Sequence, residues 1–367
     1  MSRRLLLRIS KRSNPHGLLQ ARKFDSCRAV SLCGSMFVLS GEDLTLPSAE
    51  VRALIQTYNT DSTCEQLGQR VIVSDLQDDE LIRKITSRAA FCRFGGSLLS
   101  TGEKLEDLVG DNFPTIPSEM TFAVASNSLD RSMCGELGAL IKSKTNARVS
   151  LDTPDIVFQL ESTESKFVLG SSDQGYKKSN WRERRPRARR FFLPSAIYPK
   201  LARFLVNLSR IKEGEYFLDP FCGTGSLLIE SSVMGIKTLG IDMTRWIARG
   251  ALLNLKGFAL DFESIVRADS TGRNLPVQSI DAIATDVPYG RASSTKGKET
   301  AQIIQEFTRA AAEALDANGK REKYCVIMHP SHVELAYDRK SFELCEQHML
   351  YVHRNLTRAI SVLRRTH

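Results

Sequence analysis

Two short motifs in the second half of the chain combine residue types that can carry out chemistry. The first has the sequence FLDPFCGTG over residues 217–225, which is typical of a strand that ends in a glycine-rich turn and opens a helix. The second has the sequence DVPY over residues 286–289, which is typical of a strand that ends in an acid and an aromatic ring. Parallel strands end at the same edge of a sheet, so a nucleotide-like cofactor and a planar, amine-bearing ring are expected at one site.

The first motif supplies an acid and two glycines for cofactor binding. Gly223 and Gly225 allow a tight turn and a close approach of the cofactor to the backbone. The motif differs from the dinucleotide pattern G-x-G-x-x-G because Asp219 precedes the turn. A carboxylate at this position repels a pyrophosphate but attracts the ammonium and sulfonium groups of S-adenosylmethionine. We therefore predict S-adenosylmethionine as the cofactor.

Two further acids follow the next two expected strands. Asp242 ends the second strand, close to the spacing of about 20 residues at which an acid binds ribose hydroxyls. Asp269 follows the third strand, where its carboxylate can accept a hydrogen bond from an adenine amine. Helix capping is the alternative role for both acids. The predicted cofactor-binding residues are Asp219, Gly223, Thr224, Gly225, Asp242 and Asp269.

The second motif predicts methylation of an exocyclic amine of a nucleobase. Such an amine is a poor nucleophile because its lone pair is delocalised into the ring. Two acceptors aimed at its N–H groups would support the positive charge that develops during transfer. The carboxylate of Asp286 and the backbone carbonyl of Val287 can serve as these acceptors, and Tyr289 can stack on the base. The predicted catalytic residues are Asp286, Val287, Pro288 and Tyr289, and a plain Pro-Tyr turn is the alternative.

Length and composition indicate a globular protein. The chain has 367 residues, of which 42% are hydrophobic and 25% charged, and this length predicts about two or three domains. No apolar run reaches the roughly 18 residues that a membrane span needs. Eight cysteines are scattered without a C-x-x-C pair, so we expect neither a metal site nor a disulfide framework. A cytoplasmic protein is expected.

The net charge of +9 is concentrated in two tracts. Residues 1–35 contain eight Lys/Arg and one acid, and so do residues 177–190, which leaves the rest of the chain net negative. Concentrated basic charge favours phosphate-bearing partners. A solvated charge run is the alternative for either tract. We expect neither a membrane nor DNA as a partner.

The chain divides into four predicted regions. Residues 1–35 are a basic N-terminal extension that we expect to be disordered, with a targeting presequence as the alternative. Residues 36–170 mix strands and single helices. Residues 171–192 are a basic linker that we expect to contact RNA. Residues 193–367 alternate regularly between strands and helices, which predicts an α/β domain with a Rossmann-like sheet.

This sheet is expected to be mostly parallel, with an antiparallel hairpin at its edge. The expected strands are Tyr216–Leu218, Thr238–Ile241, Ser264–Arg267, Ala282–Thr285, Tyr324–Met328 and the hairpin pair Leu350–Val352 and Arg358–Leu363.

The two motifs resemble the paired motifs of class I S-adenosylmethionine-dependent methyltransferases that act on guanine N2 of RNA. Other segments are similar to the archaeal-type tRNA (guanine-10 N2)-methyltransferase and dimethyltransferase family. Those segments are the ferredoxin-like Met36–Leu54, the closing part of a THUMP domain at Val149–Leu169, the helix at Phe191–Leu208 and the C-terminal strand motif Val352–Arg358.

The resemblance implies an N-terminal α+β region, ferredoxin-like and THUMP, that holds tRNA, and a methyltransferase domain that reaches guanosine 10. It implies mono- or dimethylation, and a small activating methyltransferase subunit as a further candidate partner. The family motif is Asp-Pro-Pro-Tyr, whereas Val287 replaces the first proline here. Valine keeps the carbonyl acceptor but gives up the fixed φ of proline, and we expect activity to survive.

Three alternatives to this function stay open at the level of sequence. The first is the same chemistry at another position of tRNA or in rRNA. The second is an RNA-binding module whose methyltransferase domain is inactive, against which the intact Asp219, Asp242 and Asp286 argue. The third is methylation of adenine N6, because an acid, a proline and an aromatic ring serve that amine equally well.

Overall fold

The computed structural model describes residues 34–41, 45–59, 61–173, 179–272, 275–277, 279–289, 299–315, 321–354 and 356–366. The extension expected at residues 1–35 lies outside this part of the chain, except for its last two residues. Over the described residues, no helix combines the length and the apolarity needed to cross a membrane.

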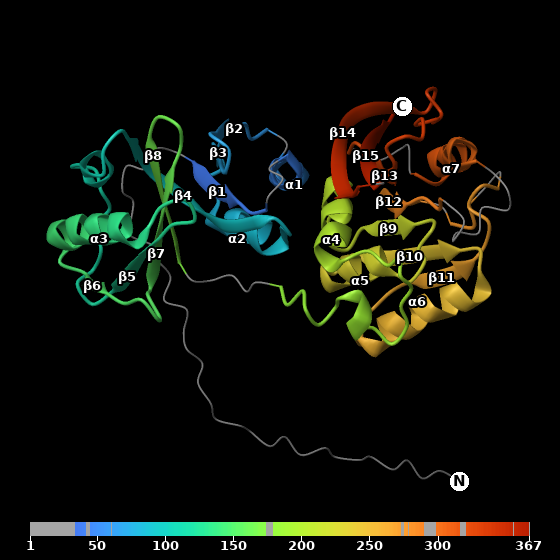
Figure 1. Ribbon diagram of the computed structural model, residues 1–367, viewed down its shortest axis with the longest axis horizontal. Coiled ribbons are helices and arrows are strands. Elements are labelled where there is room, and N and C mark those ends of the chain that lie inside the picture. Colours follow the sequence, from blue (N-terminus) through green and yellow to red (C-terminus); the bar gives the residue numbers. More distant parts are fainter. Residues whose placement is uncertain are drawn as a thin grey trace, which may run out of the picture.

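The N-terminal half is built on one eight-stranded sheet with the order β2-β3-β1-β4-β8-β7-β5-β6 (Figure 1). Most neighbouring strands are antiparallel, whereas β5 runs parallel to β6 and β7. The elements are β1 (Ser35–Leu39), α1 (Thr45–Tyr58), β2 (Cys64–Leu67), β3 (Val71–Ser74), α2 (Asp79–Arg88), β4 (Cys92–Gly102), η1 (Glu106–Val109), β5 (Thr121–Ala125), α3 (Arg131–Thr145), β6 (Arg148–Val149), β7 (Ile156–Ser162) and β8 (Phe167–Asp173).

The C-terminal half is built on a seven-stranded sheet with the order β11-β10-β9-β12-β13-β15-β14. Neighbours from β11 to β13 are parallel, while β15 is antiparallel to both β13 and β14. The elements are η2 (Pro186–Ala188), α4 (Pro199–Leu208), β9 (Tyr216–Asp219), α5 (Ser226–Val233), β10 (Lys237–Asp242), α6 (Arg245–Gly257), β11 (Ser264–Arg267), β12 (Ala282–Asp286), α7 (Thr300–Ala314), β13 (Tyr324–Pro330), β14 (Phe342–His353) and β15 (Leu356–Arg365).

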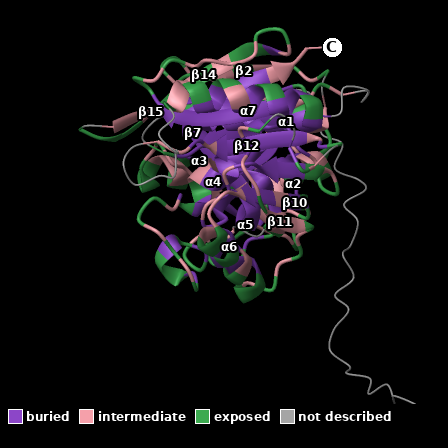
Figure 2. Cartoon of the chain, turned by 90° about the vertical axis from the view of Figure 1, so that its right-hand side faces the viewer, coloured by how far each residue is buried: buried purple, intermediate pink, exposed green. Residues whose placement is uncertain are grey.

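This topology confirms the α/β, Rossmann-like sheet with an antiparallel edge hairpin. Side chains alternate between the two faces of a strand, so successive buried residues enter two different cores. Phe217, Ala284 and Val326 lie in one core, whereas Leu218 and Ile327 lie in the other. Figure 2 shows this buried interior between exposed outer surfaces. The edge strand β14 is longer than the expected Leu350–Val352, because polar residues at 343 and 346–348 interrupt its apolar pattern.

Helix α1 belongs to the N-terminal half in sequence but helps to cover the C-terminal sheet. Leu46, Ala49 and Ala53 of α1 lie in the same buried core as Phe204 and Leu205 of α4. The two halves of the chain therefore share an apolar interface rather than meeting only through a linker.

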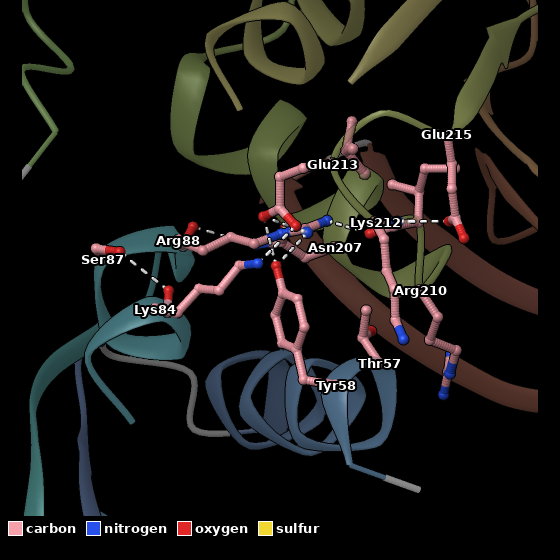
Figure 3. Close-up of polar contacts among 12 residues, drawn as sticks. Thr57, Tyr58, Lys84, Ser87, Arg88, Asn207, Arg210, Lys212, Glu213 and Glu215 are labelled. Atoms are coloured by element: carbon pink, nitrogen blue, oxygen red, sulfur yellow. Dashed lines mark hydrogen bonds and ion pairs between the residues drawn. The ribbon is translucent and has the colours of Figure 1, made fainter. Parts of the chain in front are cut away.

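A partly buried polar network joins the halves beside this interface (Figure 3). Arg88 ends α2, and its guanidinium donates to Asn207 Oδ1 at 2.9 Å and to the carbonyl of Ile211 at 2.7 Å. Arg88 also donates to the hydroxyl of Tyr58 at 2.7 Å, and this hydroxyl donates to Glu213 at 2.6 Å. Since the network connects α1 and α2 to the segment around α4, it holds the two halves in one orientation.

The basic segment 179–192, called the basic strap below, lies against α5 and α6. Arg184 donates to both carboxylate oxygens of Glu230 on α5, at 2.7 and 3.2 Å. Arg189 donates to the hydroxyl of Ser226 at 2.6 Å and to the carbonyl of Ile197 at 3.1 Å. Both arginines are buried, so part of the positive charge of this segment fixes the strap to the C-terminal half.

Candidate active site

A cavity of about 310 Å³ opens at the carboxyl ends of the central parallel strands. Strands β10 and β11 lie on one side of β9, and β12 lies on the other, so the cavity sits where the strand order reverses. Nine of the ten predicted site residues line it, and Gly225 forms the N-cap of α5 directly behind it. The nine are Asp219, Gly223, Thr224, Asp242, Asp269, Asp286, Val287, Pro288 and Tyr289.

Asp219 ends β9 and is only 2% exposed. Its Oδ1 accepts from the hydroxyl of Thr285 at 2.7 Å and from the backbone N–H of Phe221 at 3.3 Å. Burial raises the pKa of Asp219 to about 7, against the lowering effect of these two hydrogen bonds. A carboxylate with so few donors would gain strongly from a cation that entered the cavity.

The glycine turn has the backbone geometry that its sequence predicts. Gly223 has φ +52° and Gly225 has φ +80°, a region that side-chain-bearing residues rarely adopt. A Cβ at Gly223 would have no atom closer than 4.0 Å, whereas a Cβ at Gly225 would come within 3.3 Å of Ala251. Gly223 therefore leaves room inside the cavity, and Gly225 lets α5 pack closely against α6.

Asp242 and Asp269 shape the loops that follow β10 and β11. Asp242 accepts from the backbone N–H groups of Gly223 at 3.1 Å and Thr244 at 2.7 Å, and burial is the largest influence on its raised pKa. Asp269 accepts from the backbone and the hydroxyl of Thr271, at 3.1 and 2.7 Å. Each carboxylate holds its own turn in place and also faces the cavity.

The DVPY motif follows β12, the strand next to β9, and lines the same cavity as the glycine turn. Asp286 ends β12 with a side chain 17% exposed, and burial raises its pKa to about 6. Val287 is buried, and its backbone N–H donates to the carbonyl of Met328 at 3.1 Å. A proline at this position has no N–H to donate. The valine thus extends the contact of β12 with β13, which offsets part of the lost φ restraint.

Sequence reasoning assigned no role to Arg358, which contacts both ends of the motif. Its Nη1 donates to Asp286 Oδ2 at 3.0 Å, and its Nη2 donates to the hydroxyl of Tyr289. Asp286 Oδ1 and Arg358 Nε are buried without a hydrogen-bond partner among the described residues. The only sequence signal was the place of Arg358 at the end of the strand motif Val352–Arg358.

Other lining residues were also missed, because they carry no chemical signature. The segment Leu193–Ile197, between the basic strap and α4, forms one wall of the cavity. Ile247 on α6 and Ile303 on α7 add apolar surface. The cavity thus combines acids at four strand ends with apolar walls, which suits a cofactor that has both cationic and aromatic parts.

Comparison with known proteins identifies the family. Residues 186–360 match the family model described as UPF0020, an RMKL-like methyltransferase domain. A tRNA (guanine(10)-N2)-dimethyltransferase from Methanocaldococcus jannaschii is 30% identical over 90% of this chain and 99% of its own length. One from Methanothermobacter thermautotrophicus is 31% identical over the same shares of both chains. The chain belongs to the tRNA (guanine(10)-N2)-dimethyltransferase family.

This membership confirms the predicted family and makes the protein an S-adenosylmethionine-dependent methyltransferase. The crystal structure of TrmN from Thermus thermophilus has the same fold, with a TM-score of 0.51 and 17% identity. That alignment covers 91% of this chain and all of the TrmN chain.

Proposed function

We propose that this protein methylates the exocyclic N2 of a guanosine in tRNA, with guanosine 10 as the target. The observation that carries the proposal is the shared cavity, which Asp286 lines together with Asp219, Asp242 and the glycine turn. The relatives from two archaea that share 99% of their own length with this chain carry the corresponding name.

The residues of the glycine side fit S-adenosylmethionine. Asp219 would neutralise the ammonium group, and the cation would oppose the effect of burial, which raises the pKa of this carboxyl. Asp242 would bind the ribose hydroxyls, and Asp269 the adenine amine. Gly223 offers bare backbone and open space beside Thr224. The cofactor supplies a methyl group on a cationic sulfur, which the amine nitrogen takes in one displacement.

The DVPY side would hold the base and increase the reactivity of its amine. The carboxylate of Asp286 and the carbonyl of Val287 accept from the two N–H groups, which favours the charge that develops on nitrogen. Asp286 or water then takes the proton that the nitrogen loses. Tyr289 stacks on the base, and Pro288 fixes the turn between them. Holding the amine in line with the methyl group supplies much of the rate increase.

The exposed charge around the cavity supports RNA as the substrate. Arg182, Arg185, Arg187 and Arg190 of the basic strap are exposed, unlike Arg184 and Arg189. The exposed Arg245, Trp246 and Arg249 begin α6, whose first turn contains no acid. Cations are unfavourable at a helix N-terminus. Their position, directly after the cavity residues Met243 and Thr244, is therefore better explained by phosphate binding than by helix stability.

We propose further that the N-terminal half is the ferredoxin-like and THUMP region, and that it binds tRNA. Its mixed sheet and its fixed orientation toward the cavity support this role. The basic strap would then form the RNA contact between this half and the methyltransferase half. The activating subunit and a cytoplasmic location belong to the proposal through the same family resemblance.

The test uses labelled S-adenosylmethionine, unmodified tRNA transcripts and nucleoside analysis of the product. The native enzyme is expected to yield N2-methylated guanosine, and Asp286→Ala to lose at least about 10²-fold in rate, as expected for loss of one preorganised charge-stabilising group. Cofactor affinity of the variant should stay within a few-fold of the native value.

Each other outcome points to a different conclusion. Methylated adenosine would favour methylation of adenine N6. Label in rRNA but not in tRNA would show that rRNA is the substrate. Binding of tRNA without any transfer would identify an inactive RNA-binding module. A large loss of cofactor affinity in Asp286→Ala would show that Asp286 binds the cofactor instead.

A further inference from the structure

The guanidinium of Arg358 lines the cavity beside the DVPY motif. It reaches in from β15, and its side chain is only 12% exposed. Nη1 donates to Asp286, Nη2 donates to Tyr289, and Cζ lies 5.2 Å from the centroid of the Tyr289 ring. One planar, N–H-bearing group thus contacts both the acid and the aromatic ring of the motif.

Guanine carries the same chemical group. Carbon 2 of guanine is bonded to three nitrogens, so its amine edge is a substituted guanidine with N–H donors in one plane. The amine-bearing carbon of adenine is bonded to only two nitrogens and has no N–H donor on the ring nitrogen beside it. Arg358 thus contacts Asp286 and Tyr289, the two side chains to which the proposed function assigns the target base.

We propose that Arg358 is an internal stand-in for guanine, which occupies the base site until the target nucleotide displaces it. This inference rests on the proposed function and deepens it, because a site that accepts a guanidinium selects guanine over adenine. In the RNA-free enzyme, Arg358 keeps the buried carboxylate of Asp286 paired. If the base site were empty, the negative charge of this carboxylate would have no partner.

The incomplete pairing of Arg358 and Asp286 fits a group that must leave. Asp286 Oδ1 and Arg358 Nε are buried without partners among the described residues, so the pair lacks the second hydrogen bond of a bidentate arginine–carboxylate contact. Arg358 also contacts the sulfur of Met328 at 3.7 Å, a weak acceptor. Guanine can offer Asp286 the same charge-assisted contact and can add ring stacking on Tyr289.

A stand-in lowers the apparent affinity for substrate, because the site is competent only when it is vacated. Removing the guanidinium should therefore lower the KM for RNA. The test compares Arg358→Met and Arg358→Lys with the native enzyme on unmodified tRNA at pH 8.5, where Asp286 is ionised. Arg364→Met is the matched control, since Arg364 lies on the same strand and pairs with Glu322 and Glu343 away from the cavity.

We expect Arg358→Met to lower KM by about 3- to 10-fold, with kcat within a few-fold of native at pH 8.5 and no change in the control. Loss of Arg358 also removes the attraction that opposes the raised pKa of Asp286. The acid limb of kcat should therefore move to higher pH in the variant. An unchanged or raised KM together with a kcat that falls equally at every pH would overturn the inference.

A binding measurement tests the stand-in without relying on turnover. Methylguanidinium should bind the cavity of Arg358→Met, detected by calorimetry and by competition with tRNA, but not that of the native enzyme. The neutral N-methylurea, of the same shape, should bind neither. Equal binding of methylguanidinium to native and variant enzyme would contradict the inference.

Arg358→Lys retains the charge without the planar fork, so it serves the same test should the methionine variant not fold. Absence of transfer by the native enzyme would instead overturn the proposed function, whatever methylguanidinium does.

Discussion

Two buried arginine–carboxylate groups in the methyltransferase half differ in how completely they are paired. Glu230 on α5 is fully buried, and its two oxygens accept from Arg184 and Arg203 at distances of 2.7–3.2 Å. Asp286 on β12 receives one guanidinium contact at 3.0 Å and has one buried oxygen without a partner among the described residues. Both are carboxylates paired with arginine in the same half of the chain. The difference in how completely they are hydrogen-bonded therefore comes from their surroundings and not from the residue types.

The difference indicates which group serves structure and which serves chemistry. A satisfied network in a low-dielectric interior holds the elements that contribute to it, here α4, α5 and the basic strap. A half-satisfied carboxylate carries an energetic cost that a ligand with a suitable donor can remove. The acceptor without a partner, Asp286 Oδ1, therefore lies where the proposed substrate would bind.

Removing one carboxylate at a time gives the largest test of this comparison. Glu230→Gln leaves two buried arginines without their charged partner and should destabilise the protein by about 3–5 kcal/mol. Asp286→Asn should cost less, about 1.5–3 kcal/mol, because it weakens one charge-assisted hydrogen bond. Urea unfolding of both variants measures the difference. Equal losses would show that both pairs are structural.

The arginines of the basic strap permit a second test. Changing the exposed Arg182, Arg185, Arg187 and Arg190 to glutamine should weaken tRNA binding by about 10- to 100-fold and flatten its salt dependence by up to about 3 in log–log slope. Filter binding at several salt concentrations measures both quantities.

The control for this test is the buried Arg184. Arg184→Gln should lower the free energy of unfolding and leave the salt slope of the folded enzyme unchanged. A salt slope that stays the same in the fourfold variant would show that the strap is not part of the RNA contact.

The smallest expected effect is the pH dependence of cofactor affinity, which depends on Asp219. Its raised pKa of about 7 means that the carboxylate is largely protonated at pH 6 and largely ionised at pH 8 in the cofactor-free protein. A cationic ammonium favours the ionised form, so cofactor affinity should rise about tenfold from pH 6 to pH 8. Binding near pH 7 should release protons, which calorimetry in buffers of different ionisation enthalpy detects. Affinity without pH dependence would remove Asp219 from the ammonium site.

The sheet and most of the cavity could be predicted because their signals are local. An apolar run that leads directly into an acid and a glycine turn predicts both a strand and the residue at which the strand ends, as at Asp219. The polar strand β2 gives no local signal, because its CEQL sequence has no apolar alternation and it forms by pairing with β3. Its position follows from the neighbouring strand rather than from its own residues.

Arg358 could not be assigned from the sequence, because its place depends on register. It pairs with Pro330 across the antiparallel β13–β15 contact, and Asp286 pairs with Met328 on the other side of β13. The guanidinium reaches Asp286 across this intervening strand, past the sulfur of Met328. The buried arginines of the basic strap were likewise indistinguishable from the exposed ones, since the acid that selects Arg184 lies 46 residues further along the chain.

The network around Arg88 fixes the separation between the two halves of the molecule. Tyr58, Asn207 and Glu213 tie the N-terminal half to the methyltransferase half, and α1 is shared with its core. Under the proposed function, any RNA contact of the N-terminal half would stand at a set distance from the cavity. The enzyme would then select its nucleotide by distance along a folded RNA rather than by the base sequence in between.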